Sequence, residues 1–185
     1  MTKHLAIIVL LSVLTFGCVA PQPRVDWTNP QEVTSRIETQ YDNLKKVTTF
    51  TGPNCASDRG DTLFIRAWKA DATSEITYQI YVKNCYLTPT STPYSADGAT
   101  WRFYGAANDE NRTALDVLPI ARSVADCKSS SCNCIFCEEI GINATREYLV
   151  QHQDGGIKIK LIGKGGEEIF SIPSGYVRAF FNAAK

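Results

Sequence analysis

The chain has 185 residues, of which 44% are hydrophobic and 21% charged, a composition typical of a folded globular protein rather than a long disordered one. It contains 19 basic and 19 acidic residues, and only Lys3 among them lies in residues 1–17. A nearly neutral chain without a basic block gives no electrostatic indication of nucleic-acid binding.

The first 17 residues have the organisation of a secretory signal peptide. Lys3 lies in a short basic start, and the apolar run from Leu5 to Phe16 is too short to span a bilayer. Gly17 then directly precedes Cys18. This junction resembles the lipobox of bacterial lipoproteins, in which a small residue precedes the cysteine that receives the lipid, although the two residues before Gly17 depart from that pattern.

The resemblance implies that Cys18 becomes the lipidated first residue of the mature protein, carrying a diacylglycerol and an acyl chain such as palmitate. It places the chain in the bacterial cell envelope, held to a lipid bilayer through Cys18. By resemblance to the way such lipoproteins are sorted in two-membrane bacteria, Val19 in place of an acidic residue favours the outer membrane, facing the periplasm. The alternative is ordinary signal-peptidase cleavage, with Cys18 as a disulfide partner. Both interpretations predict a compartment in which disulfide bonds persist.

After the signal peptide (1–17), the chain divides into the lipidated cysteine with a tether (18–28) and a single disulfide-stabilised globular domain (29–185). The tether contains Pro21 and Pro23 and shows no apolar periodicity. The absence of repeats or a second composition shift gives no reason to divide the domain further.

An amphipathic helix is predicted from Pro30 to about Thr48. Asn29 suits the N-cap, and proline is favoured in the first helical turn. Apolar residues then follow at spacings of three and four, which predicts one apolar face packed on the domain's own sheet. They are Val33, Ile37, Tyr41, Leu44 and Val47.

Later segments have the period of β-strands. Alternating apolar residues predict strands at 63–69, 76–83, 101–104, 115–124, 140–144, 157–161 and 169–172. Pro119 predicts an edge position or a bulge, and residues 87–100 predict a long loop. A short C-terminal helix follows Pro173. We therefore expect a mainly β (α+β) fold, an antiparallel β-sandwich or barrel-like sheet with an N-terminal amphipathic helix and a short C-terminal helix.

Six cysteines remain after Cys18, an even number that suits disulfide bonds. The candidates are Cys55, Cys85, Cys127, Cys132, Cys134 and Cys137. We expect Cys55 to pair with Cys85, and the other four to pair among themselves and hold a central hairpin together. The cluster spacing does not match a standard zinc or iron–sulfur motif.

No catalytic constellation is evident in the sequence. His152 is the only histidine after residue 4, and a solvated side chain is expected there because it precedes a Gly-Gly turn. We therefore expect no catalytic residue, no metal site and no cofactor. The predicted function is that of a non-enzymatic envelope lipoprotein with a structural or protein-interaction role, whose partners are a lipid bilayer and an unidentified envelope protein.

Two alternative functions remain open. One is a thiol oxidoreductase that uses Cys134 and Cys137, whose spacing is that of a redox dithiol, although a strand-like context does not supply the helix N-terminus that such a motif needs. The other is a small-ligand carrier lined by Tyr78, Trp101 and Phe103, although such aromatic residues more often belong to a core.

Overall fold

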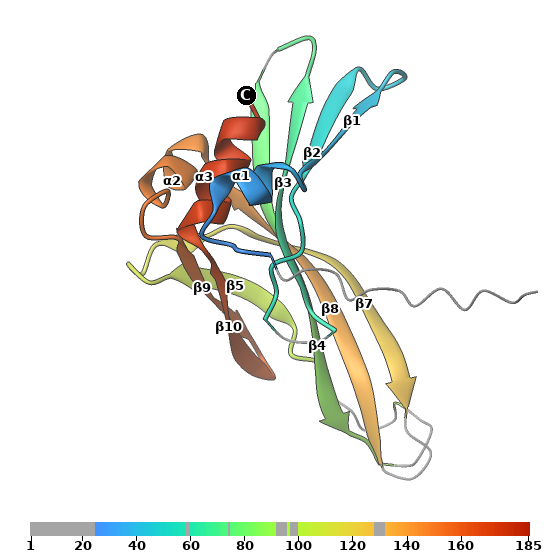
Figure 1. The fold of residues 1–185 in the computed structure, drawn as a ribbon. Coiled ribbons are helices and arrows are strands. Elements are labelled where there is room, and N and C mark those ends of the chain that lie inside the picture. Colours follow the sequence, from blue (N-terminus) through green and yellow to red (C-terminus); the bar gives the residue numbers. More distant parts are fainter. Residues whose placement is uncertain (1–24, 58–59, 74, 92–95, 97–99, 128–131) are drawn as a thin grey trace, which may run out of the picture.

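The computed structural model describes residues 25–57, 60–73, 75–91, 96, 100–127 and 132–185. The predicted signal peptide, Cys18 and most of the tether lie outside these described residues. Within them the chain forms a β-rich α+β fold with two antiparallel sheets and a group of helices (Figure 1). The prediction of a mainly β fold is confirmed at this level.

The larger sheet has six strands in the order β1-β2-β3-β4-β8-β7, and the smaller has four in the order β10-β9-β5-β6. The strands of the larger sheet are β1 (Glu38–Asp42), β2 (Val47–Thr51), β3 (Thr62–Ala70), β4 (Ile76–Pro89), β7 (Val117–Cys127) and β8 (Asn133–Ala144). Those of the smaller sheet are β5 (Tyr104–Asp109), β6 (Ala114–Leu115), β9 (Ile157–Gly163) and β10 (Gly166–Ile172). The helices are α1 (Pro30–Thr34), α2 (Arg146–Gln151) and α3 (Ser174–Ala183).

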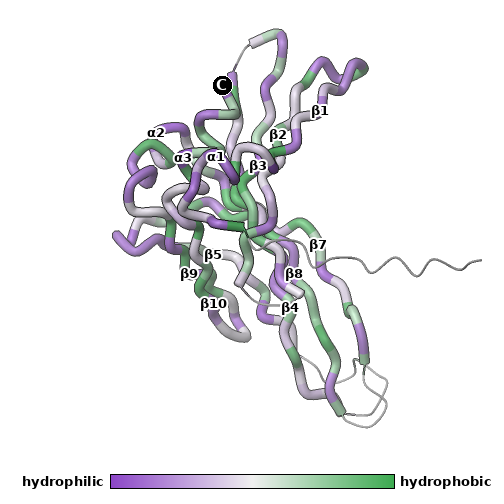
Figure 2. The backbone as a smooth tube through the Cα atoms, in the orientation of Figure 1, coloured by the Kyte–Doolittle hydropathy of each residue, from purple (hydrophilic) through white to green (hydrophobic). Residues whose placement is uncertain are grey.

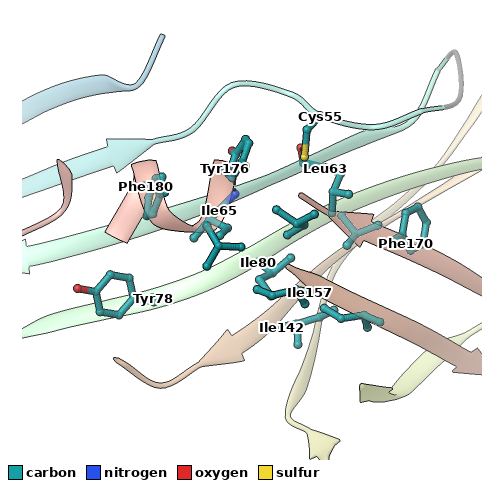
Figure 3. Packing of buried hydrophobic residues seen from close by; sticks show 14 of the residues in the cluster. Cys55, Leu63, Ile65, Tyr78, Ile80, Ile142, Ile157, Phe170, Tyr176 and Phe180 are labelled. Carbon is teal, nitrogen blue, oxygen red and sulfur yellow. Dashed lines mark hydrogen bonds between the residues drawn. The ribbon is translucent and has the colours of Figure 1, made fainter. Parts of the chain in front are cut away.

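The hydrophobic core lies between the two sheets. Ile80 on β4 is the register partner of Ile142 on β8, and alternate residues of each strand point to the same face. Both side chains are fully buried and lie close to Ile157 of the smaller sheet (Figure 3). Full burial of such a side chain contributes roughly 1.5–3 kcal/mol, so this layer is a main source of stability.

The C-terminal helix α3 covers another part of the larger sheet. Tyr176 and Phe180 of α3 lie close to Ile65 on β3 (Figure 3). The hydroxyl of Tyr78 on β4 donates a hydrogen bond to the carbonyl of Ala184, at the end of the helix, at 3.0 Å. The predicted short C-terminal helix is therefore present, and its apolar face packs on the sheet.

The prediction of a long N-terminal helix is wrong. The helix begins where the sequence indicated, at Pro30, and the side chain of Asn29 accepts hydrogen bonds from the N–H groups of Gln31 and Glu32. It ends at Thr34, however, and the chain continues into the β1–β2 hairpin.

The cause of this difference is the turn between β1 and β2. The carboxylate of Asp42 accepts hydrogen bonds from the N–H groups of Leu44 and Lys45 at 2.9 and 3.0 Å, which starts a turn. The following Val-Thr-Thr-Phe-Thr segment favours a strand. Leu44, expected on the buried face of a helix, is 94% exposed at the hydrophilic tip of the hairpin (Figure 2).

Other elements differ in extent. β4 runs to Pro89, into the segment that was expected to be a loop, and the strand expected at 101–104 begins only at Tyr104. The sequence analysis did not anticipate α2, although Thr145 caps it by accepting a hydrogen bond from the Tyr148 N–H. The expectation for Pro119 is confirmed, because β7 is an edge strand and its register shifts between Pro119 and Ala121.

Candidate functional site

Three strands of the larger sheet, β4, β8 and β7, continue past the smaller sheet as an arm (Figure 1). We use the name arm for residues 84–89, 133–138 and 122–127. Hydrophobic and hydrophilic segments alternate along β7 (Figure 2). The arm combines disulfide bonds, buried polar groups and an exposed sheet edge.

Two disulfide bonds cross the arm. Cys85–Cys137 joins β4 to β8, and Cys127–Cys134 joins β7 to β8. In both bonds the cysteines are register partners on neighbouring antiparallel strands. Cys134 and Cys137 are three residues apart on β8, so they project from opposite faces, and the two bonds brace both faces of the arm.

The predicted pairing of Cys55 with Cys85 is wrong. The antiparallel register places Cys137, not Cys55, directly opposite Cys85. Cys55 keeps a free thiol near the core, which donates a hydrogen bond to the carbonyl of Leu63 at 3.3 Å. Burial raises the pKa of Cys55 to about 12, so this thiol stays protonated at neutral pH.

The cysteine cluster itself is paired only in part. Cys127 and Cys134 are bonded and hold the β7–β8 hairpin together, as expected for the cluster. Cys132 is free and exposed. Cys137 bonds outside the cluster, to Cys85, so counting cysteines did not give the pairing.

A buried carboxylate lies on the inner face of the arm. Glu138 is 2% exposed. It accepts hydrogen bonds from the Tyr86 hydroxyl at 2.6 Å, from the N–H groups of Phe103 and Tyr104 at 3.0 and 3.3 Å, and from Nε of Arg122 at 3.2 Å. A buried charge requires such partners, and these connect β8 to β4, to β7 and to the start of β5.

The carboxylate of Glu138 stabilises an unusual backbone conformation at Phe103. Its φ is 51°, in the left-handed region that costs a residue with a side chain roughly 1–2 kcal/mol. The N–H groups of Phe103 and Tyr104 both point to Glu138, which stabilises this conformation. The guanidinium of Arg122 lies 4.7 Å from the centroid of the partly exposed Phe103 ring.

Arg102 connects this group to the smaller sheet. Its Nη1 donates hydrogen bonds to the Tyr104 hydroxyl oxygen at 2.7 Å, to Glu168 at 2.9 Å and to Asn84 at 3.2 Å. Its guanidinium lies 4.3 Å from the centroid of the Tyr86 ring. Burial raises the pKa of Tyr104 to about 12, so its hydroxyl remains a donor and bonds to Asn84 at 2.8 Å.

We call Tyr86, Arg102, Tyr104, Arg122 and Glu138 the polar clamp. Its members form hydrogen bonds with one another. They connect the arm, which is part of the larger sheet, to the smaller sheet through Arg102 and Tyr104. Sequence reasoning missed it because its residues come from four separate segments and no local spacing connects them. The sequence offered one signal, a cationic residue on a predicted strand and an acidic residue on the other side of the cysteine cluster, Arg122 and Glu138.

His152 is not the solvated turn residue that the sequence suggested. It is 6% exposed and lies at the end of α2. Its Nδ1 is 2.8 Å from the carbonyl of Tyr148, and its Nε2 is 3.7 Å from the carboxylate of Asp109. Asp109 also accepts hydrogen bonds from the N–H groups of Asn111 and Thr113. The imidazole therefore joins α2 to the turn after β5.

β7 forms a free edge of the larger sheet within the described residues. We call residues 118–126 the β7 edge, and all of them are exposed. Leu118 is 53% exposed, and Ile120 and Val124 are each 42% exposed. Pro119 and two register shifts interrupt the strand, and such features limit indiscriminate pairing of sheet edges. An edge whose pairing is limited in this way, but which exposes apolar side chains, suits selective contact with another protein.

The residues of the two alternative functions are not brought together. Trp101 packs on Phe136 with ring centroids 4.2 Å apart, whereas Tyr78 lies near Phe181 of α3 and Phe103 is exposed at the arm. These aromatic side chains therefore do not line a common cavity. Cys134 and Cys137 belong to different disulfide bonds and do not form a dithiol pair.

Comparison of the chain with protein-family models, with curated proteins and with solved structures found no match. In the part of the chain that the structure describes, no helix is both long and apolar enough to cross a bilayer. The same part contains no group of three His, Cys, Asp or Glu side chains arranged to hold a metal ion.

Proposed function

We propose that the protein is a lipid-anchored component of the bacterial cell envelope that contacts a partner protein through its β7 edge. The anchor rests on the lipobox-like junction at Gly17 and Cys18. The role is non-enzymatic, and the protein faces the periplasm from the outer membrane. The interaction rests on the geometry of the arm.

The observation that carries this proposal is an exposed apolar edge on a braced support. Two disulfide bonds and the polar clamp hold β7 in place, while Leu118, Ile120 and Val124 remain exposed along it. Complete burial of each such side chain would contribute roughly 1.5–3 kcal/mol. Because the edge is ordered before binding, this chain loses little conformational entropy when the complex forms, and less of this energy is offset.

The tether limits where the partner is found. Trp27 already packs against the Tyr176 ring of α3, so the tether ends before it, and residues 19–25 reach roughly 23 Å when fully extended at about 3.3 Å per residue. The domain therefore remains near the lipid surface, and its partner is another protein of that layer.

Photo-cross-linking in intact cells tests the proposal. A photoreactive amino acid at Leu118 should give one discrete cross-linked species that contains another envelope protein. Lys158, exposed on β9 of the smaller sheet, is the matched control and should not give it. Equal products from both positions, or no product from Leu118, Ile120 and Val124, would contradict an interaction at the β7 edge.

A further inference from the structure

A groove of about 1020 Å³ lies at the end of the larger sheet that is opposite the arm. Its walls come from the beginning of β4, from β6, from the end of β8 and from α2, and we call it the α2 groove. Ala114 and Leu115 of β6 line it, whereas β5, the neighbour of β6 in the smaller sheet, does not. β6 is the edge strand of the smaller sheet among the described residues, and it borders the groove.

The floor of the α2 groove is apolar and aromatic. Tyr78 and Tyr148 are buried there, and Ile76, Leu115 and Ala144 are half-buried. Such a floor accepts an apolar side chain, because covering it removes hydrophobic surface from water.

The rim of the groove is acidic. Glu75, Asp116 and Glu147 are exposed along it, and none of them forms an ion pair with a cation in the described ranges. The one guanidinium of the lining, that of Arg146, lies 5.1 Å from the centroid of the Phe181 ring. Three carboxylates against one guanidinium give the groove a negative potential, which attracts cationic groups.

Tyr148 contributes its ring to the floor of the groove, while its hydroxyl is enclosed by the protein and is not reached from the groove. Its side chain is 8% exposed, and its hydroxyl is the one buried side-chain polar atom without a hydrogen-bond partner in the described part of the chain. Burial raises the pKa of Tyr148, and the carboxylates of Asp109 and Glu110 add to this effect. The hydroxyl therefore stays neutral.

We propose that the α2 groove binds an extended, basic segment of a partner protein. The backbone of the segment pairs with the free edge of β6, and its lysine or arginine side chains meet the acidic rim. An apolar side chain of the segment covers the floor. Asp116 of the rim lies two residues before the β7 edge, but none of residues 118–126 lines the groove, so this inference does not depend on the proposed function.

A protein segment fits the groove better than a compact small cation. The rim carboxylates are spread over three places, before β4 at Glu75, after β6 at Asp116 and on α2 at Glu147. One small cation cannot pair with all three while also meeting the strand edge in the wall. An extended chain presents side chains and backbone groups at intervals along its length, as this arrangement requires.

Titration of the full-length protein with a short blocked peptide of alternating lysine and leucine tests the proposal. We expect saturable binding that weakens as salt is added. The triple variant Glu75→Gln, Asp116→Asn and Glu147→Gln should bind the peptide about tenfold more weakly or worse, because three exposed charge pairs are lost.

The matched control removes the same number of carboxylates elsewhere. The variant Glu38→Gln, Asp154→Asn and Glu167→Gln should bind the peptide as the unmodified protein does, since none of these residues lines the groove. Tyr148→Phe keeps the ring and removes a hydroxyl that is not exposed to the groove, and should bind the peptide as the unmodified protein does.

Four results would overturn the proposal. They are equal affinities of the two triple variants, equal binding of a glutamate–leucine peptide, no binding of the lysine–leucine peptide, and self-association of the protein that the groove variant abolishes. The last result would assign the groove to a second copy of this chain. Spermidine that binds more tightly than the peptide and displaces it would assign the groove to a small cation, and would also exclude a protein segment.

Discussion

The hydroxyl of Tyr176 on the C-terminal helix donates a hydrogen bond to the carbonyl of Pro53 at 2.9 Å, across 123 residues of sequence. The same oxygen accepts a hydrogen bond from the N–H group of Ile65 at 3.2 Å. Gly52 lies against this oxygen, so that a Cβ at position 52 would overlap it. One phenol thus fixes α3 to the connection between β2 and β3, where the helix covers the sheet.

Replacing Tyr176 with phenylalanine should destabilise the protein by about 1–3 kcal/mol, because two backbone groups of the interior lose their partner. The free energy of unfolding, measured by urea denaturation, checks this. Tyr148→Phe is the matched control, since its hydroxyl has no partner among the described residues. That variant should be as stable as the unmodified protein or more stable, and equal losses in both variants would contradict this account of Tyr176.

Replacing Glu138 with glutamine should loosen the polar clamp. The amide keeps one acceptor oxygen, so its NH₂ group would face either the Tyr86 hydroxyl and the Phe103 N–H or the Tyr104 N–H and the Arg122 Nε in place of an acceptor. We expect a loss of roughly 1.5–3 kcal/mol, the range for hydrogen bonds to a charged group. Hydrogen exchange should also become faster at the Phe103 amide.

Glu139→Gln is the control for this variant. Glu139 is the next residue on β8, so it lies on the opposite face, where it accepts a hydrogen bond from Tyr81 at 2.7 Å and its side chain is 26% exposed. Solvent limits what a charge at that position contributes. If Glu139→Gln costs as much as Glu138→Gln, the buried clamp has no special role in stability.

The two disulfide bonds should contribute unequally. Cys85–Cys137 closes a segment of 52 residues and Cys127–Cys134 one of 7. In the chain-entropy account these correspond to about 4 and about 2.4 kcal/mol. Double serine variants of each pair, compared by denaturation with Cys132→Ser, measure the two contributions. A larger loss from the shorter bridge would show that strain or local packing outweighs the entropy of the unfolded chain.

Alkylation of thiols should distinguish the two free cysteines. Cys132 is exposed, so iodoacetamide should modify it in the native protein at pH 8. Burial raises the pKa of Cys55 to about 12, and the thiolate is the form that reacts. Cys55 should therefore react only after denaturation, as peptide mass spectrometry can show. Modification of Cys85 or Cys137 in the native protein would contradict the observed pairing.

The sequence was most informative where one face of a strand or helix is buried. The alternation at Ile157–Leu161 and the apolar face after Ser174 predicted β9 and α3, because each packs one side on the core. For residues 30–48 the sequence predicted a helix where the structure has a short helix and a β-hairpin. Helical spacing of apolar residues there coincided with a strand–turn–strand sequence, in which the Asp42 turn and the β-branched residues after it decide the structure.

Most of the candidate sites could not be predicted from the sequence. The cysteine partners depend on the register of β4 against β8, which no local pattern specifies. The polar clamp and the α2 groove depend on residues that meet only after both sheets have formed. Pro119 is the exception, since proline lacks an N–H group and this predicted an edge position or a bulge, both of which β7 shows at that residue.

The last prediction concerns the proposed lipid anchor at Cys18. Replacing Cys18 with serine removes the thiol that would carry the diacylglycerol, and should leave the precursor uncleaved. The unmodified protein should remain in the membrane fraction until detergent is added, because two or more buried acyl chains give stable anchoring at about 0.8 kcal/mol per buried CH₂ group. Cell fractionation, with mass spectrometry of the N-terminal peptide, measures both effects.

Cys132→Ser is the control for the anchor, because it makes the same chemical change at an exposed cysteine that the structure shows to be unpaired. That variant should be processed and should fractionate like the unmodified protein. Normal cleavage of the Cys18→Ser precursor, followed by release of a soluble periplasmic protein, would exclude a lipid at this position. The chain would then be secreted after ordinary signal-peptidase cleavage. The domain would not be held at the membrane, and a partner at the β7 edge could be a soluble periplasmic protein.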